Sequence, residues 1–292
     1  MYSADFAYQA PTTLADAIKL LQSGGDGAKV LAGGQSLIPL MKLRLAEPGT
    51  LIDLGRIPEL RGVREDGNDI VLGATTTYIE LITNATVQAK LPLLVETIRQ
   101  VGDQQVRARG TIGGSLAHSD PAGDVPAAVL ALDGQIMATG PNSERTIAAR
   151  DFFVDLLTTA LQPGEVLTAV RLPAANQART GSAYVKHRHP ASGYAVVGAA
   201  ALVRLADDGT CQQAQCAITG AGSHAMRQTA VEQALAGKAP DDATLAGAAA
   251  HAADGLDLMS DTYASSAYRA HLAQVLTRRA LAAAVARATG SA

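Results

Sequence analysis

Two pairs of adjacent glycines constrain this chain more than any other feature of its sequence. Gly33-Gly34 and Gly113-Gly114 each follow an apolar segment, and a serine, Ser36 or Ser115, follows each closely. Adjacent glycines let the backbone adopt positive φ and turn successive N–H groups into one concavity, which suits phosphate oxygens. One such pair is most often a simple turn, but the two together predict a cradle for a diphosphate.

The familiar fingerprints of other nucleotide-binding folds and of hydrolases are absent from the sequence. No G-x-G-x-x-G opens a helix after a strand, and neither G-x-x-x-x-G-K-[ST] nor G-x-S-x-G occurs. A dinucleotide would therefore be held without a Rossmann unit or a P-loop. Since no nucleophile–base pair is visible either, we predict no catalytic side chain in this protein.

Composition excludes several classes of function. With 24 Lys and Arg against 27 Asp and Glu, and with only 3% aromatic residues, the chain has neither the charge nor the rings of a nucleic-acid binder. Its two cysteines cannot supply the four thiolates of an iron–sulfur cluster or a structural zinc site. Cys211 and Cys216 lie five apart on one predicted strand, so we expect inert thiols on opposite faces of it.

Neither a leader nor a membrane span is expected. The first residues, 1–6, carry no basic segment, and the longest apolar run, around residues 195–203, is too short to cross a bilayer. We therefore predict a cytoplasmic protein.

Apolar periodicity predicts a chain in which helices and strands alternate and then give way to a hairpin and a long helix. Helices are expected at 14–21, 77–83, 91–101, 127–132 and 267–288, and strands at 29–32, 50–54, 69–73, 135–138, 194–205 and 210–219. The glycine-rich stretch 107–124 shows no helical period and is predicted to be a long ordered loop. Residues 173–177 read as a linker.

The strings around the glycine pairs resemble a known family. Residues 32–45, AGGQSLIPLMKLRL, and 111–124, TIGGSLAHSDPAGD, look like the two FAD-binding signatures of the medium subunits of molybdenum hydroxylases. These are the flavoprotein subunits of aerobic carbon monoxide dehydrogenase and its relatives, similar to the flavin domain of xanthine oxidoreductase. The resemblance covers essentially the whole chain, including Arg107-x-Arg109-Gly110-Thr111 and the Tyr268-Arg269-Ala270-His271-Leu272 string.

The resemblance implies an α+β fold. Residues 1–175 would form an FAD-binding domain of the vanillyl-alcohol-oxidase (PCMH) type, in subdomains of about 1–55 and 56–175. Residues 176–292 would form a smaller α+β domain of the carbon monoxide dehydrogenase flavoprotein type that covers the flavin.

The family's cofactor-binding residues carry over to positions in both strings. The loop expected to wrap the FAD diphosphate comprises Leu31, Ala32, Gly33, Gly34, Gln35, Ser36 and Leu37. Thr111, Gly114 and Ser115 would form a second wall, with the Ser115 hydroxyl offered to a phosphate.

Two residues after this wall have ordinary alternatives beside their family roles. His118 would lie near the diphosphate or the ribityl chain, or would be a turn histidine. Asp124 would hydrogen-bond the flavin or the adenosine part, or would cap the helix at 127.

Four further residues are expected around the flavin ring. Val101 and Leu167 align with apolar ring contacts, although apolar residues are core by default. Lys186 aligns with a lysine whose charge would stabilise the reduced flavin, and its alternative is a solvated strand lysine. Tyr194 would cover the isoalloxazine face or pack inside the C-terminal domain.

Two basic clusters were considered for ligand binding. His187 and His189 share a strand face, but no third ligand follows at metal-site spacing, so we predict no metal site. Arg107 and Arg109 would meet a phosphate or a partner's carboxylate, with a structural salt bridge as the ordinary alternative.

The functional expectation is an FAD-binding subunit of a heteromeric molybdenum hydroxylase. In such a complex a large subunit holds the molybdopterin, a small subunit holds two two-iron two-sulfur clusters, and the FAD passes electrons to an external acceptor. The resemblance implies that the complex is a dimer of heterotrimers. The alternatives are a flavin-free scaffold subunit of such a complex and a free-standing flavin oxidoreductase. The substrate and the acceptor cannot be read from this chain.

Overall fold

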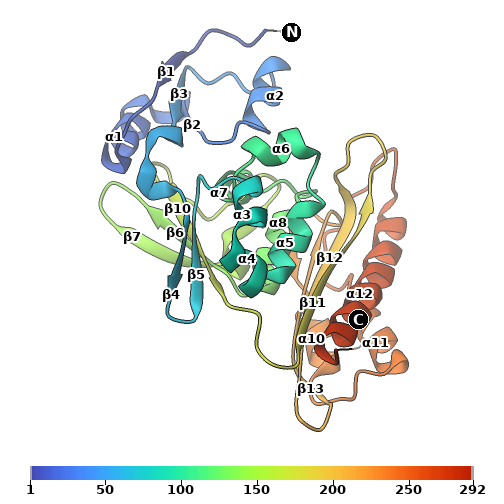
Figure 1. Ribbon diagram of the computed structural model, residues 1–292. Coiled ribbons are helices and arrows are strands. Elements are labelled where there is room, and N and C mark those ends of the chain that lie inside the picture. The colour runs from blue at the N-terminus through green and yellow to red at the C-terminus, as the bar shows by residue number, and fades with distance from the viewer. Residues whose placement is uncertain (1, 291–292) are drawn as a thin grey trace.

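The computed structural model describes residues 2–290, so Met1, Ser291 and Ala292, at the ends of the two predicted domains, lie outside the described residues. The first part of the chain is a small parallel sheet in the order β1-β3-β2, drawn in blue in Figure 1. Its strands and helices are β1 Ala7–Gln9, α1 Leu14–Gly24, β2 Ala28–Leu31, α2 Leu37–Lys42 and β3 Thr50–Asp53.

Helix α1 confirms the pattern that predicted it. The Thr13 side chain accepts the amide N–H of Asp16 at 3.2 Å and so caps the helix N-terminus. Ala17 and Ile18 are buried, as the apolar spacing requires.

The second part is an antiparallel sheet in the order β4-β5-β10-β6-β7. The strands are β4 Val63–Asp66, β5 Asp69–Gly73, β6 Gln135–Thr139, β7 Glu144–Ala148 and β10 Val166–Pro173. Ile70, Leu72 and Val170 belong to one large core with the helices that cover this face. The opposite face is open and lines a cavity described below.

The helices that cover the sheet come from the middle of the chain. They are α3 Tyr78–Thr83, α4 Ala85–Lys90, α5 Pro92–Arg99, α6 Gln104–Arg109, α7 Ile112–His118, α8 Asp124–Ala131 and α9 Ala149–Phe152, with the short strands β8 Phe153–Asp155 and β9 Thr158–Thr159 after them. Helix α3 matches its prediction, and Thr77 and Glu80 cap it reciprocally.

The predicted loop at 107–124 is wrong, because α6 ends inside this stretch, α7 lies within it and α8 begins at its last residue. Asp103 accepts the N–H of Val106 at 2.8 Å, and Thr111 accepts that of Gly114 at 3.1 Å, so α6 and α7 are both capped locally. Glycines lower helix propensity, but these helices are too short to show an apolar period and are held by caps and packing instead.

The third part is a four-stranded antiparallel sheet in the order β11-β12-β13-β14. Its elements are β11 Thr180–Arg188, β12 Ala195–Leu205, β13 Cys211–Thr219, β14 Met226–Arg227, α10 Thr229–Leu235, α11 Asp242–Ala249 and α12 Ser266–Ala288. Helix α12 packs on one face, and α8 of the second part packs on the other (Figure 1). All eight residues of α8 are buried, because α8 fills the space between the second and third parts.

The two cysteines correct another prediction. Cys211 and Cys216 are both buried in the core beneath α12, on the same side of β13. The register between β12 and β13 shifts between Leu205 and Arg204, where Gln212 has no partner, and this bulge reverses the alternation of faces. Burial raises the pKa of both thiols, that of Cys216 to about 12, so the expectation of inert thiols agrees with the structure.

Among residues 2–290, no helix is both long enough and apolar enough to cross a membrane.

The packing of β11 on α12 predicts the effect of one methyl group. A Cβ at Gly181 would lie 2.0 Å from the Ala284 carbonyl oxygen, so Gly181→Ala should lower the free energy of unfolding by about 1–3 kcal/mol through overpacking. The control is Gly247→Ala in α11, where a Cβ meets nothing within 4 Å and should raise stability by about 0.5–1 kcal/mol. Urea denaturation of both variants checks this, and equal effects would contradict it.

Candidate cofactor-binding site

The structure brings the two glycine pairs together. A Cβ built on Gly33 would lie 2.2 Å from the Arg109 carbonyl oxygen, and one on Gly114 would lie 3.9 Å from the Ala32 Cβ. The loop between β2 and α2 therefore rests against the end of α6 and the start of α7. The first and second parts of the fold meet at this contact.

Close packing explains why glycine occupies these positions. A Cβ on Gly113 would lie 2.6 Å from the Ala74 Cβ and 2.8 Å from its carbonyl oxygen. Gly34 adopts a φ of +72°, which side chains of L-residues rarely tolerate. The glycines thus let backbone meet backbone, and a larger residue at Gly33 or Gly113 would push the segments apart.

The first loop offers free backbone donors, and most donors of the second wall are already used. Among residues 2–290, the N–H groups of Gly34, Gln35 and Ser36 donate no backbone hydrogen bond. On the other side, Ile112 donates to the Thr76 carbonyl at 3.2 Å and Gly113 to the Ala74 carbonyl at 2.9 Å. An anion in the cradle would therefore find its backbone donors in the first loop.

A buried ion pair lies where α8 meets the third part. Lys186 on β11 places its Nζ 2.9 Å from Asp124 Oδ2, and the Lys186 side chain is fully buried. The Tyr184 hydroxyl donates to Asp124 Oδ1 at 2.5 Å. Lys186 also donates to the carbonyl oxygens of Gln100 at 2.9 Å and Gly193 at 3.0 Å, so three acceptors surround its ammonium group.

These contacts rule out the ordinary alternatives for two predicted residues, whose roles at the cofactor stay predictions. Lys186 is not a solvated strand lysine. Asp124 is the first residue of α8 and follows the N-cap Gly123, so its carboxylate does not cap the helix. Its negative charge lies at the helix N-terminus, where the helix dipole favours it.

Burial dominates the ionisation of the group. It raises the pKa of Asp124, and the Lys186 charge and the Tyr184 hydrogen bond oppose this rise. Burial lowers the pKa of Lys186, against the attraction of Asp124. Burial and the neighbouring Asp124 charge raise the pKa of Tyr184 well above its usual value. The tyrosine is therefore a neutral donor that helps hold the carboxylate in its charged form.

The sequence did not predict one residue of this region, Tyr78. Tyr78, the first residue of α3, is buried, and burial raises its pKa while a hydrogen bond from Ser115 opposes the rise. The Ser115 hydroxyl, expected at a phosphate, thus lies close enough to Tyr78 to lower its pKa. Gly110 also packs against the Tyr78 ring, since a Cβ there would lie 2.9 Å from it. The sequence signal next to Tyr78 is the capping motif of Thr77 and Glu80, which predicts the start of a helix and not a binding site.

The segment after α7 is held by the third part. The Thr219 hydroxyl donates to the carbonyl oxygens of Pro121 and Gly123 at 2.8 and 2.7 Å. Within this segment Ser119 adopts a φ of +51°, and its buried hydroxyl has no hydrogen-bond partner among the described residues. An unpartnered buried hydroxyl beside the cradle is a free polar group for a ligand.

His118 and Tyr194 lie at the edge of this region. His118 Nε2 is 4.0 Å from Asp120 Oδ2, and the histidine is half-buried. Tyr194 is 45% exposed, so it does not pack inside the C-terminal domain. Together with Asp120, Asp261 and Arg269 it lines a cavity of about 260 Å³ between the second and third parts.

The apolar residues expected at the flavin ring, and the basic residues considered as ligands, contact other residues of the chain. Leu167 is buried in the large core, and Val101 packs against it half-buried, as apolar residues do by default. Arg107 donates to the Val101 carbonyl at 2.8 Å, so the expected salt bridge is not what holds it. His189 stacks on Tyr263 with ring centroids 4.5 Å apart, and no group of three or more potential metal ligands exists within residues 2–290.

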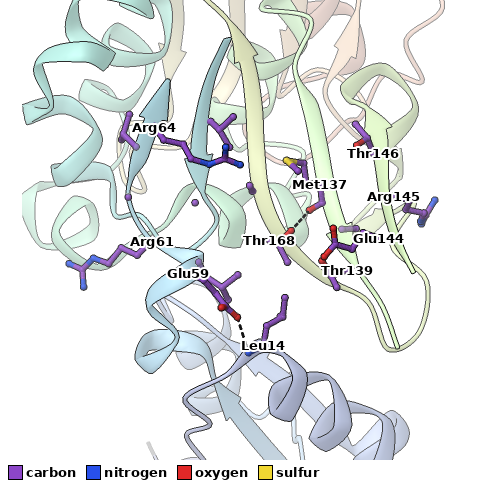
Figure 2. A pocket seen from close by; sticks show the side chains of 17 residues that line it. Leu14, Glu59, Arg61, Arg64, Met137, Thr139, Glu144, Arg145, Thr146 and Thr168 are labelled. Carbon is purple, nitrogen blue, oxygen red and sulfur yellow. Dashed lines mark hydrogen bonds between the residues drawn. The ribbon is translucent and has the colours of Figure 1, made fainter. Parts of the chain in front are cut away.

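A larger cavity than that beside Tyr194 lies elsewhere, on the open face of the five-stranded sheet. Figure 2 shows this groove of about 600 Å³, with Thr168 and Met137 on its floor and Glu59 at its lower end, where Glu59 accepts the Leu14 N–H. None of the predicted cofactor-binding residues lines it. The groove is therefore separate from the cradle.

A glycine cradle where the first and second parts meet, with the third part packed against α8 of the second, is the kind of site that binds a phosphate-bearing cofactor at a junction of domains. Comparison with known proteins specifies the cofactor. Residues 4–175 match the family described as "FAD binding domain in molybdopterin dehydrogenase", and residues 182–284 match "CO dehydrogenase flavoprotein C-terminal domain".

Individual relatives match over nearly their whole length. The carbon monoxide dehydrogenase medium chain of Hydrogenophaga pseudoflava is 40% identical over 97% of this chain and 98% of that one. The 6-hydroxypseudooxynicotine dehydrogenase complex subunit alpha of Paenarthrobacter nicotinovorans is 36% identical over 99% and 97%. A chain in a solved structure of the Hydrogenophaga pseudoflava carbon monoxide dehydrogenase superposes with a TM-score of 0.95, at 42% identity, over 98% of this chain and 99% of that one.

The chain belongs to the family of FAD-binding medium subunits of molybdopterin dehydrogenases. It is thus a flavoprotein subunit of an oxidoreductase, and FAD is its cofactor. The fold is the α+β fold that the sequence predicted. The free N–H groups of the first loop and the space kept open by glycine fit the diphosphate of that cofactor.

The buried ion pair yields a prediction for stability. Asp124→Asn leaves the Lys186 charge buried and unpaired, so the free energy of unfolding should fall by roughly 3–5 kcal/mol. Adding Lys186→Met to Asp124→Asn should recover part of this loss, because the unpaired charge is removed. Denaturation of the two single variants and the double variant measures the coupling, and additive effects would show that the pair does not act as one unit.

Proposed function

We propose that this chain carries FAD between an iron–sulfur subunit and an external electron acceptor, within a heteromeric molybdenum hydroxylase. The observation that carries the proposal is the contact between the two glycine pairs, which joins the two FAD-binding strings of the sequence into one cradle. The relatives named above are subunits of dehydrogenases, one of them described as a complex, and this supports the assignment to a multi-subunit enzyme.

The residues would divide the binding of the cofactor as follows. The loop from Leu31 to Leu37 would donate its free N–H groups to the diphosphate. Thr111, Gly114, Ser115 and His118 would form the opposite wall. Ser115 would act there beside Tyr78, whose pKa its hydroxyl lowers.

The ring end of the cofactor would lie toward the third part. Asp124 and Lys186 would face it as a neutralised pair rather than as a lone positive charge, since three acceptors surround the ammonium group. Tyr194, exposed at the domain junction, would cover the ring, and Val101 and Leu167 would support it from the core.

Bound FAD supplies reversible electron transfer, and the protein's contribution is binding, orientation and control of access. Nothing in the chain requires a catalytic side chain beyond these roles. The buried Cys211 and Cys216 are not accessible as cluster ligands, which supports iron–sulfur clusters in a partner subunit. We likewise expect the molybdopterin in a partner subunit.

The finer organisation stays part of the proposal. We place the domain boundary at 175/176 and the subdomain boundary near 55, and we expect a large molybdopterin subunit and a small iron–sulfur subunit in a dimer of heterotrimers in the cytoplasm. The hydroxylated substrate binds another chain and is not assigned.

The visible absorption spectrum tests the proposal. Flavin bands are expected for the purified chain, alone or co-expressed with its partner subunits, and absence of bands in both preparations would favour a flavin-free scaffold. Bands in a chain that copurifies with no partner would favour a free-standing flavin oxidoreductase.

A variant locates the cofactor in the cradle. Gly114→Val would fill the concavity between the two loops, because a Cβ there already lies 2.7 Å from the Thr111 hydroxyl, and FAD content should fall at least about tenfold. Gly247→Val is the matched control, a helical glycine facing open space, and it should keep its FAD. Equal FAD content in both variants would place the cofactor elsewhere.

A further inference from the structure

The turn between β11 and β12 carries the tyrosine expected over the flavin. Tyr194 ends this turn, and its carbonyl oxygen accepts the N–H of His189 at 2.8 Å. Gly193 donates its N–H to the His189 carbonyl at 2.9 Å. The Gly193 carbonyl accepts from Lys186 Nζ at 3.0 Å, which ties the turn to the buried ion pair. We call residues 189–194 the 189–194 turn.

The His189 side chain shapes this turn from inside. Its Nδ1 accepts the N–H groups of Ala191 and Ser192, each at 3.3 Å. A ring nitrogen that accepts a hydrogen bond carries no proton, so the imidazole is neutral and holds its proton on Nε2. The ring thus does here what an asparagine or aspartate side chain does when it accepts an N–H two residues further along a turn.

An aromatic contact holds the ring from the side of α12. The ring of Tyr263, which lies before α12, has its centroid 4.5 Å from that of His189. Asp261 fixes the segment that carries this tyrosine, because its Oδ1 accepts the N–H groups of Tyr263 and Ala264 at 2.8 Å. Asp261 also pairs with the buried Arg269 of α12 at 2.5 Å. The imidazole is therefore held between its own turn and a segment anchored on α12.

The position of Tyr194 depends on the shape of the turn. Burial raises the pKa of Tyr194, and the charges of Asp120 and Asp124 raise it further, so the phenol lies near the segment after α7. His189 and Tyr194 line the same cavity of about 260 Å³ between the second and third parts. A looser turn would move the tyrosine relative to the residues expected at the cofactor.

We propose that His189 is a positioning residue, whose neutral ring with its proton on Nε2 sets Tyr194 against the flavin. The inference rests on the proposed function, which places Tyr194 over the flavin ring. Protonation would put a proton on Nδ1, so the ring could no longer accept from Ala191 and Ser192. The turn would then lose two internal hydrogen bonds and hold Tyr194 less firmly. The cover over the flavin is therefore tightest when His189 is neutral and loosens as the pH falls.

The other groups around the ring are charged or neutral for their own reasons. Lys186 and Arg188 precede His189 on β11 and donate to the carbonyl at the end of α5, at 2.9 and 3.0 Å. The cavity that His189 lines is also lined by Asp120, Asp261 and Arg269. Hydrogen bonds from the backbone before α12 and the neighbouring arginine charge hold the pKa of Asp261 below its usual value, so it stays an anion.

Two further histidines lie close enough to require separation from His189. His118 Nε2 is 4.0 Å from Asp120 Oδ2. The His187 ring lies edge to face against Tyr268, with centroids 6.1 Å apart. His187 is the matched control, because it also lies on β11 against a tyrosine of α12 but outside the 189–194 turn.

The fluorescence of bound, oxidised FAD tests the inference in the full-length chain. A tyrosine in contact with a flavin quenches its emission, so emission should rise at least about twofold from about pH 8 to about pH 5, the range in which histidine side chains change charge. Ultrafiltration shows that the FAD remains bound. Tyr194→Leu should give the higher emission at both pH values.

Substitutions of His189 separate its hydrogen bonds from its charge. Asparagine places an acceptor at the same number of bonds from the backbone and does not titrate, so His189→Asn should keep the low emission at both pH values. His189→Leu removes the acceptor and should give the higher emission at both. The control His187→Asn should show the same rise as the original chain.

Ring-nitrogen NMR of the labelled histidines checks the tautomer without relying on the flavin. The chain has six histidines, and the signals lost in His189→Asn belong to His189. At about pH 8 they should show a proton on Nε2 and an accepting Nδ1.

Three results would overturn the inference. They are emission that does not change with pH in the original chain, a rise that persists in His189→Asn and so belongs to another group, and a proton on Nδ1 of His189 at about pH 8. A chain without flavin bands would instead refute the proposed function, and with it the role of Tyr194 at a flavin, while the NMR result would stand by itself.

Discussion

The buried group of Asp124, Lys186 and Tyr184 is the interaction on which the rest of the structure depends. It lies where the fully buried α8 meets β11, so it fixes how the C-terminal sheet sits over the second part of the fold. Burying two charges is unfavourable unless each is fully paired, and here every acceptor and donor of the pair is used. The arrangement therefore admits one relative position of the two parts.

Close backbone contacts at glycine residues fix the junction between the first and second parts of the fold. Gly33 lies against the Arg109 carbonyl, and Gly113 against Ala74, so neither contact survives a side chain. Gly198 on β12 serves the ion-pair group in the same way, because a Cβ there would lie 2.2 Å from the Tyr184 hydroxyl. A cofactor site between domains needs such positions, since its walls come from segments far apart in the sequence.

The two junctions between the parts of the fold indicate where the cofactor would lie. The cradle lies between the first and second parts, and Tyr194 and the small cavity lie between the second and third, so one extended cofactor would run along both. Helix α2 directly continues the cradle loop. For the electron transfer that we propose, the cofactor would need to lie at an edge that partners can reach.

The sequence by itself determined the family, the α+β fold, the cofactor and most of the regular elements, because these depend on local patterns and on two strings of residues that each lie together in the chain. Tertiary structure alone decided the rest. Helices α6 and α7 appear where glycine predicted a loop, the bulge in β13 turns both cysteines to one side, and Lys186 finds its counter-charge 62 residues away at Asp124. Bulges and ion pairs of this kind depend on which segments contact each other in the fold. The periodicity of apolar residues along the sequence does not predict those contacts.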